Sequence, residues 1–92
     1  MKKENEYILT QPIFERIYDL KLYPNPTSGL ITIQSNETMD EIVIYNMFGQ
    51  EMQKIDQAGT QTQVSLENLP LGVYIVKATW GTNQKTVRII KE

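Results

Sequence analysis

The residues of this chain that could carry acid–base or nucleophilic chemistry are carboxylates, lysines and hydroxyls, because its 92 residues include no histidine and no cysteine. Histidine is the usual general base and the commonest metal ligand, and cysteine supplies thiolate nucleophiles, thiolate metal sites and disulfides. No spacing suggests paired catalytic carboxylates or a serine–lysine arrangement, and the acids lack the spacing of a calcium loop. We therefore expect no catalytic residue, no metal and no cofactor.

Charge is unevenly distributed along the chain, although the net charge is only -2. The middle of the chain is acidic, whereas the C-terminal region carries Lys77, Lys85, Arg88 and Lys91. A nucleic-acid-binding domain would need a basic footprint, so we exclude nucleic acid as a partner. No apolar run approaches the roughly 20 residues of a membrane-spanning helix, and the start of the chain lacks the apolar stretch of a secretory signal.

Short apolar or alternating segments, separated by Gly, Pro, Asn and Thr, predict an all-β fold. Ile31 and Ile33 alternate with polar residues, so we expect one buried face there, whereas "EIVIYN" is apolar on both faces, as in a central strand. Gly49 in "NMFGQ" favours a hairpin turn. About seven strands at this spacing predict an immunoglobulin-like antiparallel β-sandwich. The expected strands are residues 18–23, "GLITIQS", "EIVIYN", "EMQKI", "TQVSLENL", "GVYIVKATW" and "KTVRIIK".

The segment "LYPNPTSG" is a stiff joint between the first two expected strands. Pro24 and Pro26 fix their own φ and hold the residues before them in extended geometry, so we expect no direct hairpin. Gly29 is able to take the left-handed conformation that releases the chain into the next strand. We interpret the joint as a crossover between two sheets, with structural rather than ligand-binding roles for Asn25, Thr27 and Ser28.

Several aromatic residues have both a structural and a functional interpretation. Tyr74 is placed to form a tyrosine corner, in which its hydroxyl ties down the preceding loop. Trp80 is a candidate anchor for a sugar or a partner, but a tryptophan at a strand end is more often half-buried packing. Tyr45, Met47 and Phe48 fit either the core or a small contact patch.

Three segments, taken in order, resemble one family: "LYPNPTSGLITI", "IVIYNMFGQEM" and "LENLPLGVYIVKATWGTNQKTVRIIKE". They are similar to the type A C-terminal sorting domain of the type IX secretion system, also called the Por secretion system. The resemblance covers Leu20 to Glu92. The family motif positions in this chain are Pro24, Asn25, Pro26, Gly29, Gly49, Gly72, Tyr74, Lys85 and Lys91.

The resemblance implies an immunoglobulin-like domain at the C-terminus of a cargo protein that crosses the periplasm to the cell surface or medium. The outer-membrane translocon recognises such a domain, and a sortase-like peptidase then commonly removes it. We expect residues 18–92 to be the sorting domain and residues 1–17 to be a linker or lead-in, where cleavage would fall. Family members follow a signal peptide and a cargo domain, so we interpret the chain as the C-terminal piece of a larger protein.

The last expected strand is the candidate recognition surface. A strand that ends the chain is often at a sheet edge, where free N–H and C=O groups can pair with a partner strand. We hypothesise that the translocon recognises this strand, and that the same edge is able to pair with a second copy of the isolated domain. The alternative is that its charges only solubilise an edge strand. The proposed recognition residues are Lys85, Thr86, Arg88, Ile90 and Lys91.

The main rival function is a fibronectin type III-like adhesion or carbohydrate-binding module, because "LENLPLGVY" also resembles the tyrosine corner of that fold. Fibronectin domains tend to bury a tryptophan early in the chain, whereas Trp80 comes late. An enzyme is a distant third possibility, because histidine and cysteine are both missing from the chain.

Overall fold

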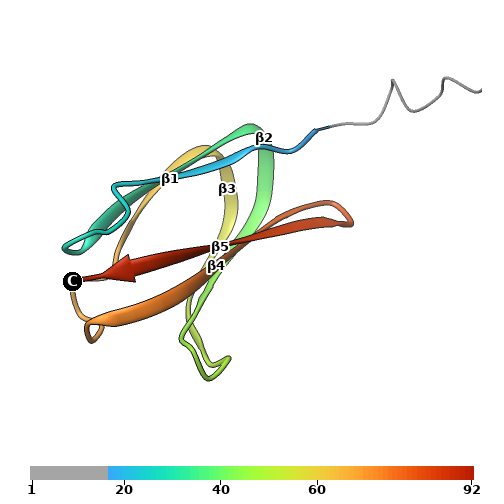
Figure 1. Ribbon diagram of the computed structural model, residues 1–92. Helices are drawn as coiled ribbons and strands as arrows, with labels where there is room; N and C mark the ends of the chain where they lie inside the picture. The colour runs from blue at the N-terminus through green and yellow to red at the C-terminus, as the bar shows by residue number, and fades with distance from the viewer. Residues whose placement is uncertain (1–16) are drawn as a thin grey trace, which may run out of the picture.

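The computed structural model describes residues 17–92, which fold into five β-strands and contain no helix (Figure 1). β1 pairs with β2, β2 pairs with β4, and β4 pairs with β5; β3 also pairs with β2. Every strand pair is antiparallel, which confirms the predicted all-β antiparallel fold. The strands are β1 (Leu20–Tyr23), β2 (Leu30–Tyr45), β3 (Glu51–Ser65), β4 (Gly72–Trp80) and β5 (Asn83–Lys91).

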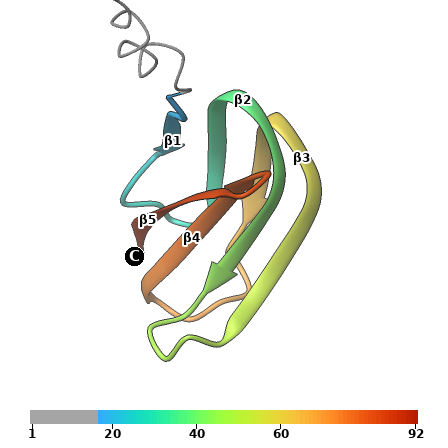
Figure 2. The ribbon, with the colours of Figure 1, turned by 90° about the vertical axis from the view of Figure 1, so that its right-hand side faces the viewer.

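Two long strands, β2 and β3, bend the sheet around the core. The first part of β2 pairs with β1, and its second part pairs with β4 along the same edge. β3 follows β2 along the other edge through both parts, with register shifts on either side of Met39. Figure 2 shows β2 and β3 curving together, so that β1 and β5 come to lie toward the same side. The result is a half-barrel rather than two separate sheets.

The prediction of about seven strands was wrong, because two expected breaks lie inside continuous strands. The polar residues before Met39 predicted a loop, and so did "QAGTQ", yet both stretches remain in β2 and β3. Met39 and Ala58 are buried, which ties both bends to the core. Gln57 and Gly59, on either side of Ala58, have φ angles of 52° and 74°, in the left-handed region. β3 changes direction at these residues. Residues 35–38 of β2 have no partner in β3, and pairing resumes with Met39 opposite Gly59.

The core lies inside the curve of the sheet. The predicted alternation of Ile31 and Ile33 is confirmed, since both are fully buried. The stretch 42–44 is buried on both faces, as expected for a central strand. Full burial of such side chains stabilises the fold by about 1.5–3 kcal/mol each. The other core residues are Met39, Ala58, Val64, Leu66, Tyr74, Val76, Ala78, Trp80 and Ile89.

The joint between β1 and β2 is not a crossover between sheets. Tyr23 pairs with Thr32, so the strands it connects are antiparallel neighbours in the same sheet. The loop of residues 24–29, which contains two cis X–Pro bonds, reaches away from β1 to β5 and then returns. Gly29 does not adopt the expected left-handed conformation. It is needed for close approach instead, because a Cβ there would lie 2.7 Å from Cγ of Glu67.

Candidate functional site

Strand β5 ends the sheet, which confirms the prediction that the last strand lies at an edge. Its register with β4 runs from Asn83 opposite Trp80 to Lys91 opposite Gly72. One side of the β5 backbone is therefore occupied by β4. The hydrogen bonds made by the backbone groups on the outer side decide how much of the edge is available to a partner.

The C-terminal half of the outer side is occupied by the proline loop. The side-chain amide of Asn25 donates to the carbonyl of Arg88 at 3.0 Å and accepts from the amide of Ile90 at 3.1 Å. The backbone of Thr27 donates to the carbonyl of Ile90 at 2.8 Å and accepts from the amide of Glu92 at 2.9 Å. We call this arrangement the clasp: Asn25 and Thr27 against residues 88–92. The sequence indicated a structural role for Asn25 but not this partner.

In its N-terminal half, the outer side of β5 faces β1 without pairing with it. Backbone groups of alternate residues in a strand point to the same side, and the clasp engages Arg88, Ile90 and Glu92. The N–H and C=O groups of Gln84 and Thr86 therefore also point outward. Within residues 17–92, no backbone hydrogen bond outside the paired strands is made by the outward groups of Gln84 and Thr86. We call these groups, together with the N–H of Arg88, the open edge.

The five predicted recognition residues lie on two faces of β5. Thr86, Arg88 and Ile90 are exposed on the outer face. Lys85 is also exposed, and its ammonium group donates to the carbonyl of Tyr18 at 3.2 Å.

Lys91 is only 8% exposed. Its ammonium group donates to the carbonyls of Glu67 and Leu69 at 3.2 and 2.7 Å. The structure thus brings three of the five predicted side chains together and directs Lys91 inward, where it joins β5 to the turn before β4.

The motif residues away from β5 shape the turns. Tyr74 donates its hydroxyl hydrogen to the carbonyl of Pro70 at 2.5 Å, so the predicted tyrosine corner is confirmed. Gly49 has φ 84° in the turn between β2 and β3, as expected. Asn46, which was not singled out from the sequence, accepts from the amides of Phe48 and Gln50 at 2.9 and 3.0 Å. Its place four residues before Gln50 in a Gly-containing turn was the available signal.

Trp80 is buried, which confirms the packing role favoured from the sequence over an exposed aromatic anchor. Its side chain is 4% exposed and its ring packs against Tyr18 with centroids 4.9 Å apart. The indole N–H is shared between Oγ of Ser35 at 3.0 Å and the carbonyl of Glu37 at 3.2 Å. Burying an indole N–H requires such partners, and only the bend of β2 brings them to the end of β4.

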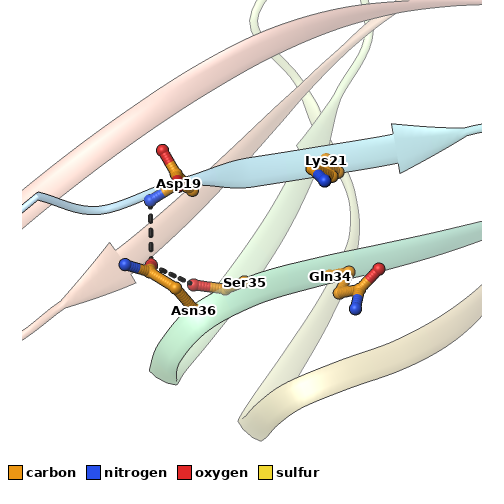
Figure 3. Close-up of a pocket in the computed structure, with 5 residues that line it drawn as sticks. All are labelled: Asp19, Lys21, Gln34, Ser35 and Asn36. Atoms are coloured by element: carbon orange, nitrogen blue, oxygen red, sulfur yellow. Dashed lines mark hydrogen bonds between the residues drawn. The ribbon is translucent and has the colours of Figure 1, made fainter.

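A small hollow of about 150 Å³ lies where β1 begins, lined by Asp19, Lys21, Gln34, Ser35 and Asn36 (Figure 3). The amide of Asn36 accepts from the backbone N–H of Asp19 at 2.9 Å and donates to the carbonyl of Ile17 at 2.7 Å. Asn36 therefore fixes the start of β1, in the way that Asn25 fixes the end of β5. The expected linker of residues 1–17 lies almost wholly outside the described residues.

The ionisable groups of the described part form no metal-binding cluster of three or more carboxylates. The pKa of Lys54 is raised above its ordinary value, because its ammonium group is hydrogen-bonded to Glu41 at 3.2 Å and attracted by that carboxylate. This pair joins β2 to β3, away from the open edge. No helix in residues 17–92 is long and apolar enough to cross a membrane.

Two comparisons with known proteins bear on this arrangement. A family model described as "Secretion system C-terminal sorting domain" matches residues 21–92, from within β1 to the end of the chain. A segment of 57 residues is 35% identical to part of the beta-agarase A of Zobellia galactanivorans. That segment is 60% of this chain but spans only 11% of the agarase.

Proposed function

The chain belongs to the family of secretion system C-terminal sorting domains, and we propose on this premise that it directs an attached cargo protein across the outer membrane through the type IX system. The observation that carries the proposal is the family match over residues 21–92, which includes the clasp and the open edge. The agarase relative supports a small module on a larger protein, because the matched segment is 11% of that protein.

The proposed recognition mode is addition of a translocon strand to the open edge. The outward N–H and C=O groups of Gln84 and Thr86 would supply the hydrogen bonds, since an extended peptide pairs readily with a free edge. Arg88 stands next to these groups on the exposed face and would attract an acidic partner strand. In this proposal Lys91 positions the strand rather than facing the partner, because its ammonium group already binds two carbonyls.

The proposed fate of the chain follows from its place behind a cargo. The cargo–domain fusion would pass through the periplasm, reach the surface or medium, and lose the domain to a sortase-like peptidase that cuts between Met1 and Tyr18. The same open edge would allow two isolated domains to pair. The rival adhesion function has lost its sugar-anchor argument, because Trp80 is buried.

The test fuses residues 1–92 to the C-terminus of a periplasmic reporter in a bacterium with a type IX system. We compare the wild-type fusion with Thr86→Pro, which removes an outward N–H, and with Lys85→Glu/Arg88→Glu. The matched control is Lys21→Glu/Lys54→Glu, which changes net charge equally on β1 and β3. We expect export of the wild type and the control, and periplasmic retention of the two edge variants as folded proteins.

Two results would contradict the proposal. If the folded wild-type fusion stays in the periplasm, the sorting function fails and an adhesion module becomes the better explanation. If both edge variants are exported at the wild-type rate, the open edge is not the recognition surface. Sedimentation of the isolated domain with and without Thr86→Pro tests edge-mediated pairing of two copies.

A further inference from the structure

An exposed apolar surface lies at the end of the domain farthest from the start of β1. The turn between β2 and β3 presents Phe48 and Met47, which are 91% and 60% exposed, and the turn between β3 and β4 presents Leu71, which is 71% exposed. Figure 2 shows both turns at the bottom, whereas β1 begins near the top. We call Met47, Phe48, Leu71 and the hollow between the two turns the apolar tip.

The hollow of the apolar tip has a volume of about 240 Å³. The lining includes no Asp, Glu, Lys or Arg. Isolated exposed apolar residues are ordinary, but a contiguous group around a hollow marks a contact surface. The lining residues are Asn46, Met47, Phe48, Met52, Pro70, Leu71, Gly72, Val73 and Tyr74.

Both turns are held in fixed conformations. The side-chain oxygen of Asn46 accepts hydrogen bonds from the amides of Phe48 and Gln50, and its amide group donates to the side chain of Gln50 at 2.7 Å. The second turn is tied down by the hydrogen bond from Tyr74 to Pro70. Apolar side chains on rigid turns lose little conformational entropy on binding, which favours their use as docking anchors.

The charges beside the apolar tip are acidic. Glu51 follows the first turn and Glu67 lies in the second, both exposed. Glu92, also exposed, follows Lys91, whose partner Gly72 lines the hollow. Two lysines of this region are already engaged: the ammonium group of Lys91 binds backbone carbonyls, and that of Lys77 lies 5.5 Å from the centroid of the Tyr45 ring.

This charge pattern identifies the kind of partner. An anionic membrane surface would be repelled by the three glutamates, and a second copy would bring the same acids together. We propose that the apolar tip docks into an apolar pocket rimmed by Lys or Arg on a protein of the export machinery. The proposal rests on the proposed function and adds a second contact, separate from the open edge and at the end away from the cargo.

The test measures binding of the reporter fusion to the detergent-solubilised outer-membrane translocon, purified from a bacterium with a type IX system. The tip variant is Phe48→Ser/Leu71→Ser, and the matched control is Ile17→Ser/Leu30→Ser, which removes two exposed apolar side chains elsewhere. We expect the tip variant to bind about tenfold or more weakly than the wild type, as when anchor residues that become buried on binding are removed. We expect its melting temperature to be unchanged. We expect the control to bind like the wild type.

Charge is tested with Glu51→Lys/Glu67→Lys. We expect its association rate to fall several-fold at low salt and to lose the salt dependence of the wild type.

Several outcomes overturn this inference. If the wild-type fusion binds the translocon and the folded tip variant binds equally well, the apolar tip is not a contact, and the proposed function still stands. If the wild type does not bind the translocon but is still exported, this inference fails and the proposed function stands; if it is not exported either, both fail. If the tip substitutions abolish only self-association, or only binding to anionic lipid vesicles, the occupant is a second copy or a membrane.

Discussion

The side-chain amide of Asn25 forms hydrogen bonds with two backbone groups of β5, accepting one from the N–H of Ile90 at 3.1 Å. Its donated bond goes to the carbonyl of Arg88 at 3.0 Å. An asparagine side chain thus replaces a neighbouring strand at the end of a sheet edge. The proline loop therefore does two things: it connects β1 to β2, and it covers the last part of the edge that the proposed function uses.

Asn25→Ala is expected to destabilise the domain by about 1–2 kcal/mol, because two backbone groups of β5 lose their partner. Chemical denaturation measures this loss, and hydrogen exchange at the amide of Ile90 should become faster. Asn68→Ala is the control, since Asn68 is an exposed turn residue. Equal stability of the two variants would show that the Asn25 side chain contributes nothing to the clasp.

Gly29→Ala is expected to destabilise by about 1–3 kcal/mol, as overpacking does, because the new Cβ would lie 2.7 Å from Cγ of Glu67. Removing that Cγ with Glu67→Ala leaves only ordinary contacts of 3.6 and 3.7 Å. The double variant should therefore recover most of the loss in a double-mutant cycle. Additive losses would mean that Gly29 is required for another reason.

Lys91→Met is expected to cost about 1–3 kcal/mol, since the carbonyls of Glu67 and Leu69 lose the ammonium group they share. Lys21→Met, at an exposed position on β1, should change the stability by less than about 0.5 kcal/mol. Denaturant titration of both variants makes the comparison. If the Lys91 variant keeps wild-type stability but is not exported, its role is recognition instead.

Trp80→Phe is expected to destabilise by about 1–3 kcal/mol, because Ser35 and the carbonyl of Glu37 lose a buried donor and the ring loses volume. In a cycle with Ser35→Ala, the coupling between the two residues should be at least about 0.5 kcal/mol. Thermal unfolding monitored by circular dichroism measures all the variants. A coupling of zero would mean that the Ser35 hydroxyl does not hold the indole.

Much of the local structure was predictable from the sequence. The alternation of Ile31 and Ile33, the apolar stretch that follows Glu41, the turn at Gly49 and the corner at Tyr74 all appear where the residue types predicted them. These features depend on neighbours within a few positions, where side-chain period and backbone preference act directly.

The number of strands was not predictable in this way. Polar residues before Met39 and the glycine at position 59 have the composition of loops, yet β2 and β3 both extend through the bend and pair again where Met39 lies opposite Gly59. Tertiary contacts overrode local preference there, because Met39 and Ala58 are buried in the core at the bend.

The candidate site also has some features that the sequence predicts and others that depend on the tertiary structure. The sequence by itself determined that the last strand is basic, because charge is a property of residue type, and it predicted an edge position for this strand. Only the tertiary structure decided that the loop around Asn25 covers its end, across 63 and 65 positions of the chain, and that Lys91 points inward. A hydrogen-bond partner so distant in sequence is fixed by how the sheet curves, and no local pattern encodes that curvature.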